Sequence, residues 1–212
     1  MEIKKMDLND IKDDLFYDAF YNKQPVILTG VIETWELYNF TVNKFNELYG
    51  DKIAPVRGSD SEGFSNYMEV EVNEYIKHMN SNPDKWYCDF PTDYEEFPNL
   101  SKMYTKPNVF QSNTTPYNKS QLHEWLYLGG KGTGTPFHVD VENSHAWNAL
   151  IFGEKEWHLL DVDADYNNIN DISKGIKYIQ KPNELLYIPP KMPHKVTNTK
   201  NSLCITGNFW DN

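Results

Sequence analysis

The second half of the chain most constrains the fold, because from about residue 121 it reads as short β-rich runs separated by turn residues. Gly153-Glu154 has the composition of a hairpin turn between two of these runs. Several short strands at close intervals are typical of a β-barrel or a β-sandwich. The strands are predicted near 136–141, 146–152, 155–160, 184–188, 194–198 and 203–210.

The first half is predicted to mix helices with short strands. Apolar residues at helical spacing predict helices at 7–21, 41–49 and about 71–79, and Lys23–Gly30 has the pattern of a strand ending at a glycine turn. Residues 91–120 are rich in Pro, Asn, Ser and Thr. We expect them to form a long surface excursion, a kind of loop that is often functional.

The length of the chain indicates one domain, since 212 residues fall close to the usual domain size. We expect a single domain over 1–212. In it, a helical and mixed part at about 1–120 braces a barrel core at about 121–212.

The chemistry of the chain is predicted from His138-Val139-Asp140. Residues two apart on a strand face the same side, so the imidazole and the carboxylate project together. His194 lies where a proline-rich turn leads into a strand and supplies a third ligand. Two imidazoles and one carboxylate form the facial triad of non-haem iron(II) oxygenases. The alternative is that His138 is a satisfied core histidine, Asp140 caps a turn and His194 lies on the surface.

A buried cation is the second requirement of an iron oxygenase that uses 2-oxoglutarate, because the far carboxylate of that dianion needs a counter-charge. An arginine shortly after the distal histidine is one solution, but no arginine follows Arg57. A lysine must then serve, and Lys155 follows the predicted Gly153-Glu154 turn. The alternative is that Lys155 is a solvated hairpin lysine.

The motifs around these residues resemble one known family, the Jumonji-C (JmjC) 2-oxoglutarate oxygenases, and in particular its lysyl hydroxylases. The resemblance implies a mainly β fold, a double-stranded β-helix (cupin-like JmjC barrel) with N-terminal helices bracing it. The segments that carry it are Gly132–Asp140, Ser144–Trp157, Lys23–Gly30 with Trp35, Leu186–His194 and Ile205–Phe209.

The same resemblance implies the roles of individual residues. His138, Asp140 and His194 would bind Fe(II), and Lys155 would bind the far carboxylate of 2-oxoglutarate. The other implied cosubstrate residues are Thr135, Asn148, Thr206 and Tyr87, with Asn208 lining the pocket.

The implied activity is that of an Fe(II)- and 2-oxoglutarate-dependent dioxygenase that hydroxylates a side chain, with lysine favoured, of a protein. A methyl-lysine demethylase is an alternative. It is less favoured because no sequence typical of a reader domain or a zinc finger accompanies the barrel, and many such demethylases carry Glu at the position of Asp140. A non-catalytic metal-binding barrel used as a binding module is another alternative, which the intact Thr135, Asn148, Lys155 and Thr206 argue against.

The charge of the chain favours a basic protein or peptide as its partner. The formal net charge is −11, which repels nucleic acid and anionic lipid. The acidic runs 161–165 and 94–96 are expected to be solvated loops or to line the entrance of a pocket that prefers lysine-bearing substrates.

Without a long apolar stretch or a secretory leader the chain is expected to be intracellular and soluble. Since it stops after the last barrel strand, where several JmjC relatives continue into pairing helices, we expect a monomer.

The remaining candidate residues are expected to be structural. Cys88 and Cys204 are predicted to be reduced, packed thiols, and Trp147 and Trp157 to be core residues rather than a substrate platform. The other histidines are read as non-ligands: His145 in a loop, His158 on the face opposite Lys155, and His78 and His123 at ordinary polar positions.

Overall fold

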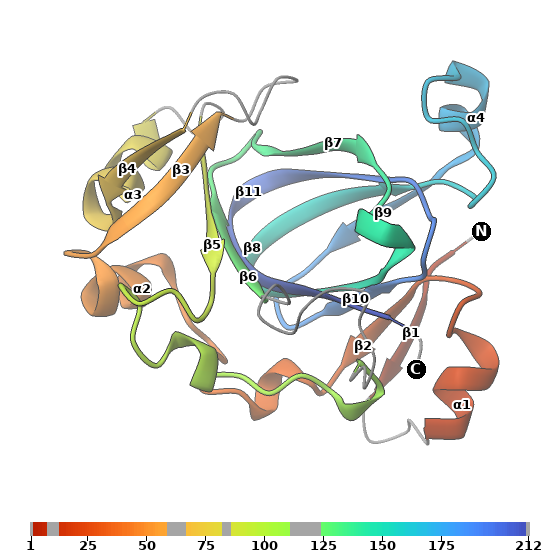
Figure 1. Cartoon of the computed structure of the whole chain (residues 1–212), viewed down its shortest axis with the longest axis horizontal. Helices are drawn as coiled ribbons and strands as arrows, with labels where there is room; N and C mark the ends of the chain where they lie inside the picture. Colours follow the sequence, from red (N-terminus) through yellow and green to blue (C-terminus); the bar gives the residue numbers. More distant parts are fainter. Residues whose placement is uncertain (1, 8–12, 59–66, 82–85, 111–123, 211–212) are drawn as a thin grey trace.

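A computed structural model of the chain describes residues 2–7, 13–58, 67–81, 86–110 and 124–210 (Figure 1). Within these residues strands outnumber helices, in agreement with the predicted fold class. The strands are β1 (Lys4–Asp7), β2 (Val26–Thr29), β3 (Ile53–Gly58), β4 (Tyr67–Glu71), β5 (Trp86–Pro91), β6 (Trp125–Gly129), β7 (Gly134–His138), β8 (His145–Leu159), β9 (Ile176–Gln180), β10 (Leu185–Ile188) and β11 (His194–Phe209).

Helices are short and lie mostly before the barrel strands. The predicted helices at 41–49 and 71–79 are confirmed. Of the predicted helix at 7–21, residues 13–19 are helical. Residue 7 ends a strand instead, and residues 8–12 lie outside the described part. The α-helices are α1 (Asp13–Ala19), α2 (Val42–Tyr49), α3 (Val72–Ser81) and α4 (Ile169–Lys174), and the 3-10 turns are η2 (Ile32–Thr34), η3 (Leu100–Lys102), η4 (Asn108–Phe110) and η6 (Val141–Asn143).

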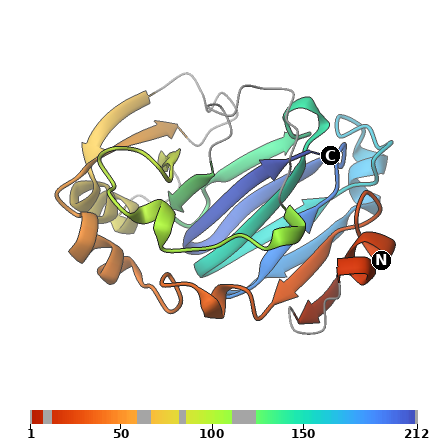
Figure 2. The same cartoon turned by 60° about the horizontal axis from the view of Figure 1, so that its bottom comes forward.

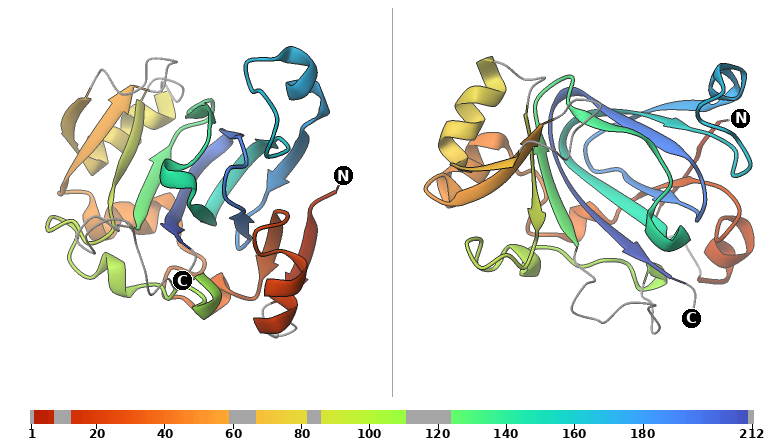
Figure 3. Two further views of the ribbon diagram at one scale, coloured as in Figure 1. Left: turned by 45° about the vertical axis from the view of Figure 1, so that its right-hand side comes forward. Right: turned by 45° about the horizontal axis from the view of Figure 1, so that its top comes forward.

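The strands belong to one mixed 11-stranded sheet of order β1-β2-β10-β8-β11-β6-β5-β3-β4, with β7 paired to β11 and β9 paired to β8. The sheet curls so that β6 to β11 surround a common interior, which Figure 3 shows from two sides. This is a cupin-like barrel, and the predicted fold class is confirmed. The strands β3 and β4 with helices α2 and α3 flank one side of it (Figure 1).

The central pair of the barrel is β8 and β11, which are antiparallel along almost their whole length. The predicted strands 146–152 and 155–160 are one strand, β8, so the hairpin predicted at Gly153-Glu154 is wrong. Gly153 has φ +96°, and the pairing with β11 shifts register nearby, between Asn198 and Cys204. A glycine with positive φ suits a β-bulge as well as a hairpin. Here it bends a continuous strand.

The segment 91–110 differs from the predicted surface excursion. It runs from the side of α2 toward the side of β2 (Figure 2) and buries Phe97, Leu100 and Phe110 in the hydrophobic core. The composition is polar overall, but most of its large apolar side chains are buried. The remaining predicted residues, 111–120, lie outside the described part of the chain.

The helical part packs on the barrel through aromatic side chains. Thr41 caps the start of helix α2, since its hydroxyl accepts the Lys44 N–H. The helix buries Phe45 and Tyr49. Cys88 and Cys204 are buried and free, as predicted. In the residues that the structure describes, no helix is long and apolar enough to cross a membrane.

Candidate metal centre and adjoining pocket

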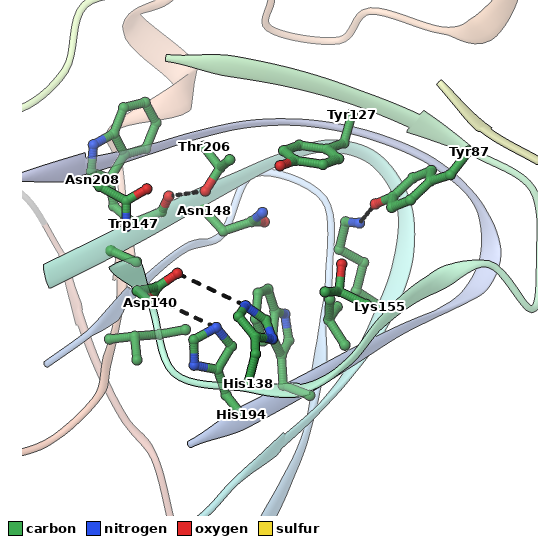
Figure 4. Close-up of a pocket in the computed structure, with 15 residues that line it drawn as sticks. Tyr87, Tyr127, His138, Asp140, Trp147, Asn148, Lys155, His194, Thr206 and Asn208 are labelled. Carbon is green, nitrogen blue, oxygen red and sulfur yellow. Dashed lines mark hydrogen bonds and ion pairs between the residues drawn. The ribbon is translucent and has the colours of Figure 1, made fainter. Parts of the chain in front are cut away.

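Three side chains converge inside the barrel. His138 is the last residue of β7, and His194 is the first residue of β11 and pairs with it. Asp140 lies two residues beyond the end of β7, in an extended conformation before η6. Its carboxylate faces both rings (Figure 4), 3.8 Å from Nε2 of His138 and 3.7 Å from Nε2 of His194. The three candidate ligand atoms all lie within 4.8 Å of one another.

These distances suit a metal ion better than direct hydrogen bonds. Separations of 3.7 and 3.8 Å are too long for hydrogen bonds between nitrogen and oxygen. Ligand atoms at about 2.1 Å from a shared ion lie roughly 3 to 4 Å apart. The prediction that Asp140 belongs to the strand is wrong, but its extended backbone keeps the carboxylate on the side of the histidines.

Both histidines are held in the tautomer that a metal ligand needs. Nδ1 of His138 lies 2.8 Å from the Pro136 carbonyl oxygen, and Nδ1 of His194 lies 2.9 Å from the Met192 carbonyl oxygen. A carbonyl only accepts, so Nδ1 carries the proton and Nε2 of the neutral ring offers a lone pair to the centre. Burial lowers the pKa of His194, which favours the neutral ring, although Asp140 opposes that shift.

The structural alternatives to a metal site do not match this geometry. His194 is 3% exposed, so it is not a surface residue. The Asp140 side chain makes no capping hydrogen bond to η6, so it is not a turn cap. His138 has its Nδ1 satisfied but directs Nε2 toward Asp140. The role of the three residues as iron ligands stays a prediction, which this arrangement fits.

Lys155 lies in the same pocket and is buried there. It is 1% exposed, so the solvated hairpin lysine is wrong. Its Nζ donates to the Tyr87 hydroxyl at 3.0 Å and to Asn198 Oδ1 at 2.8 Å. No carboxylate pairs with it among the described residues. Burial lowers its pKa, and the neighbouring Cys204 thiol opposes the shift.

Comparison with known proteins identifies relatives of the chain, although no family model matches it. It is 26% identical to lysine-specific demethylase JMJ21 of Arabidopsis thaliana, over 94% of this chain and 24% of that protein. It is 24% identical to bifunctional arginine demethylase and lysyl-hydroxylase psr-1 of Caenorhabditis elegans, over 98% of this chain and 61% of that protein. It is 26% identical to 2-oxoglutarate and iron-dependent oxygenase JMJD4 of Gallus gallus, over 92% of this chain and 57% of that protein.

The chain is a homologue of JmjC-domain demethylases and oxygenases. The family resemblance predicted from the sequence is confirmed. The chain spans from about a quarter to three fifths of the length of these relatives, 24% to 61%.

All the residues that the JmjC resemblance implied for the site line one pocket in the barrel interior. The apolar part of its wall adds Trp147 and Trp157, which are buried as predicted but also face the pocket (Figure 4). The lining residues are Tyr87, Tyr127, Thr135, His138, Asp140, Ala146, Trp147, Asn148, Lys155, Trp157, Ile188, His194, Val196, Thr206 and Asn208.

Asn148 has an unsatisfied polar atom in this pocket. The residue is 6% exposed, its Nδ2 donates to Cys204 Sγ at 3.2 Å, and its buried Oδ1 has no hydrogen-bond partner. Such an atom is rare unless a ligand or a rearrangement satisfies it. Turning the amide by 180° lets the thiol donate to Oδ1 and presents the Nδ2 hydrogens to the pocket. Asn148 therefore fits the JmjC cosubstrate contact.

Thr206 and Asn208 line the pocket while bonding to the protein. The Thr206 hydroxyl donates to the Trp147 carbonyl oxygen at 2.5 Å. Asn208 Nδ2 donates to Ser144 Oγ at 2.9 Å and to the His145 carbonyl oxygen at 3.3 Å. In this arrangement Thr206 can accept a hydrogen bond from a ligand. It donates one only if its hydroxyl leaves the Trp147 carbonyl.

His145 is not one of the three converging side chains. It is the first residue of β8, not part of a loop as predicted, and its Nδ1 lies 2.8 Å from the Tyr187 hydroxyl. Its ring stacks on Tyr21 and Phe209, with centroids 4.5 and 4.6 Å away. His158 contacts Phe137 at a centroid distance of 5.2 Å, and His123 lies outside the described residues.

Several residues of the site were not found from the sequence. Tyr127 lines the pocket, and Asn198 holds Lys155. Arg57 forms a buried ion pair with Asp89 at 2.5 Å and lies over the Tyr87 ring, 5.2 Å from its centroid. Asn198 carried a usable signal, because it is four residues after His194 on one strand and so shares its face.

Proposed function

We propose that the chain is an Fe(II)- and 2-oxoglutarate-dependent oxygenase that hydroxylates a side chain, by preference a lysine, of a basic protein. The observation that carries the proposal is a buried lysine that no carboxylate of the described residues pairs with, in one pocket with a converging His-Asp-His set. A metal-binding barrel alone needs only the three ligands. A buried, uncompensated cation beside them is explained by an anionic cosubstrate.

The protein supplies a donor set that suits iron. His138, Asp140 and His194 would hold Fe(II) on one face, which leaves the other face open. When bound, iron(II) and 2-oxoglutarate supply oxygen activation coupled to decarboxylation, which inserts one oxygen atom into a substrate C–H bond. The carbonyl oxygens of Pro136 and Met192 keep the two imidazoles oriented before the metal arrives.

Lys155 and Tyr87 would orient the far carboxylate of 2-oxoglutarate. An unpaired buried charge is costly, and a carboxylate supplies the missing partner. The Tyr87 hydroxyl accepts from Lys155 and also neighbours the Asn198 side chain, so a ligand carboxylate in the pocket would compete with Asn198 for its proton. Burial raises the pKa of Tyr87 well above its usual value, which keeps that proton in place at neutral pH.

The apolar wall would keep bulk water from the reacting centre. Trp147, Trp157 and Ile188 are buried and line the pocket beside the triad. Low local polarity strengthens the interaction of Lys155 with a bound carboxylate.

A basic protein substrate is supported by relatives and by charge. JMJ21 is named a lysine-specific demethylase, and psr-1 a bifunctional arginine demethylase and lysyl-hydroxylase. The acidic run 161–165 lies near the triad strand, because Tyr166 next to it stacks on Phe137 of β7 at 6.5 Å. Exposed Asp161 and Asp163 there would attract a cationic segment.

Demethylation of methylated lysine or arginine is the second candidate, favoured by the names of these relatives. Oxygen insertion at an N-methyl group releases formaldehyde, whereas insertion into a lysine chain leaves a stable hydroxyl group. The two outcomes are distinguished by the product.

The monomeric state and the intracellular location of the chain stay predictions.

The test is incubation of the purified chain with Fe(II), ascorbate, 2-oxoglutarate and a panel of basic peptides, with and without methylation. We expect succinate release together with a peptide mass gain of one oxygen atom. His138→Ala should abolish both, whereas His158→Ala, outside the triad, should not. Formaldehyde without a stable hydroxyl group would establish the demethylase instead. An unchanged yield in His138→Ala would refute the proposed site.

A further inference from the structure

The Lys155 ammonium is held by two neutral oxygen acceptors and has the Cys204 thiol as a further neighbour. An ammonium has three N–H donors. One is directed to the Tyr87 hydroxyl and one to Asn198 Oδ1. The third has the Cys204 thiol as its neighbour, a weak acceptor, and since Lys155 lines the pocket a carboxylate bound there can take its place. Asn198 lies directly across from Lys155 in the β8–β11 pairing and is 1% exposed.

The orientation of the Asn198 amide is fixed by a chain of hydrogen bonds. Its Nδ2 donates to Thr133 Oγ1 at 2.9 Å, and the Thr133 hydroxyl donates to the Gly130 carbonyl oxygen at 2.7 Å. Because the only hydroxyl proton of Thr133 is used in this way, Thr133 Oγ1 must accept from Asn198. The amide oxygen of Asn198 therefore has to face Lys155.

The backbone around the amide is clamped as well. The Asn198 N–H donates to the Thr133 carbonyl oxygen, and the Gly132 N–H donates to the Asn198 carbonyl oxygen, both at 2.8 Å. Thr133 is completely buried. The turn between β6 and β7 thus holds Asn198 rigidly against Lys155.

A carboxylate at position 198 would have the same shape as this amide but the opposite effect on charge. It would neutralise Lys155 within the protein and leave nothing for an anionic ligand. We propose that Asn198 is a positioning residue of the 2-oxoglutarate site, which orients the Lys155 ammonium and, by being neutral, reserves its charge for a dicarboxylate. This inference rests on the proposed function, and it adds a residue that does not itself touch the cosubstrate.

The test compares two substitutions with different effects on charge and on orientation. Asn198→Asp keeps the shape and adds a carboxylate beside Nζ. We expect it to raise the Kd for 2-oxoglutarate about 100-fold or more, as loss of a buried charge partner does. Asn198→Ala removes the orienting oxygen but leaves the charge, and we expect a rise of about tenfold. Thr133→Val, which frees the amide, should resemble Asn198→Ala.

Binding is measured by calorimetry without oxygen, with Mn²⁺ in place of iron, so that no turnover is needed. Mn²⁺ affinity in the absence of 2-oxoglutarate should stay unchanged in all variants, which also reports that the barrel is folded. Asn43→Asp is the matched control. It makes the same change in net charge at an exposed position of α2 and should bind 2-oxoglutarate like the wild type.

Glutarate, which has the far carboxylate but no 2-oxo group, separates this inference from the proposed function. If the wild type binds glutarate and Asn198→Asp does not, the inference stands even where Mn²⁺ fails to promote 2-oxoglutarate binding, and only the proposed function is lost. If Asn198→Asp binds 2-oxoglutarate within threefold of the wild type, the inference is wrong and the function stands. Binding of neither compound by the wild type would overturn both.

Discussion

The two histidines of the candidate metal centre are oriented by the same kind of local hydrogen bond. Each donates from Nδ1 to the carbonyl oxygen two residues earlier in the chain, Pro136 for His138 and Met192 for His194. Each hydrogen bond needs only a few residues of extended chain, so the tautomer is set locally. The convergence of the two rings is not local, because it depends on the pairing of β7 with β11.

Replacement of Lys155 tests the charge in the pocket. Lys155→Met keeps much of the volume and removes the cation, so we expect the Kd for 2-oxoglutarate to rise about 10² to 10³-fold, as loss of one member of a buried charge pair does. Metal affinity should not change, since Lys155 is not among the three converging ligands. Calorimetry with Mn²⁺ measures both quantities. A Kd within threefold of the wild type would contradict the assignment of Lys155.

The pH dependence of the same binding follows from the lowered pKa of Lys155, which burial causes. A bound carboxylate favours the charged lysine and raises that pKa, so binding is tight below the pKa of the free protein. Affinity should fall as pH rises through it, below the usual value of 10.5. Proton uptake on binding should appear over the same range.

The control for this pH profile is Lys155→Met, because Tyr87 and Cys204 also face the ammonium. The profile of this variant should lose the fall assigned to Lys155. In the ligand-free wild type, stability should rise with pH over the same interval, since the unfolded lysine still binds a proton that the folded one has lost. If the affinity of the wild type for 2-oxoglutarate does not change between about pH 7 and 10, this account is wrong.

At the level of elements, the bulge in β8 decides where Lys155 points. Gly153 has a positive φ, and Glu154 anchors the bend through Lys181 and through the Thr199 hydroxyl, 2.9 Å from its carboxylate. The strand then continues with Lys155 opposite Asn198. An unbroken strand would turn every later side chain to the other face.

Gly153→Ala tests the importance of this bulge. A Cβ there would collide with the Asn201 carbonyl oxygen, and φ would stay at +96°. We expect a loss of at least about 2 kcal/mol of stability from backbone strain and the clash, together with weaker 2-oxoglutarate binding from a displaced Lys155. Thermal unfolding and calorimetry measure the two effects. Glu154→Gln, which leaves the glycine in place, should have the smaller effect on both, and equal effects would show that the backbone conformation does not matter.

The elements also show why the sequence predicted some features and not others. The triad was found because His138 and Asp140 are neighbours in the chain and His194 follows a recognisable turn. Gly153-Glu154 was misread because a bulge and a hairpin have the same local composition, and only the partner strand β11 distinguishes them. Asn198 was missed because its role arises from a cross-strand pair.

The N-terminal elements were predicted less well for a similar reason. Strands β3, β4 and β5 are paired only with one another and with β6, and their sequences show weak alternation. The segment 91–110 looked like a surface loop by composition, although Phe97 and Phe110 make it part of the core. Burial of a few aromatic side chains outweighs an otherwise polar composition.

The whole molecule combines a negative surface with a positive group at the bottom of its pocket. The formal net charge is −11, whereas Lys155 is buried in the barrel. Exposed acidic residues act on an approaching protein through solvent, over a range of about 8 Å at physiological ionic strength. Lys155 acts on a small ligand through the protein interior, where salt screens much less.

Salt should therefore affect the two binding events of this chain differently. Affinity for a lysine-rich peptide should fall steadily as sodium chloride is raised from about 0.05 to 0.5 M, because screening weakens its attraction to exposed acidic residues such as Asp161 and Asp163. Affinity for 2-oxoglutarate should change much less, because its contact with Lys155 is buried.

A peptide of the same composition with glutamate in place of lysine is the control and should not bind at any salt concentration. Fluorescence anisotropy of labelled peptides and calorimetry of 2-oxoglutarate give the two slopes. Equal slopes would mean that the surface charge does not guide the substrate, and tighter peptide binding at high salt would indicate an apolar docking surface instead.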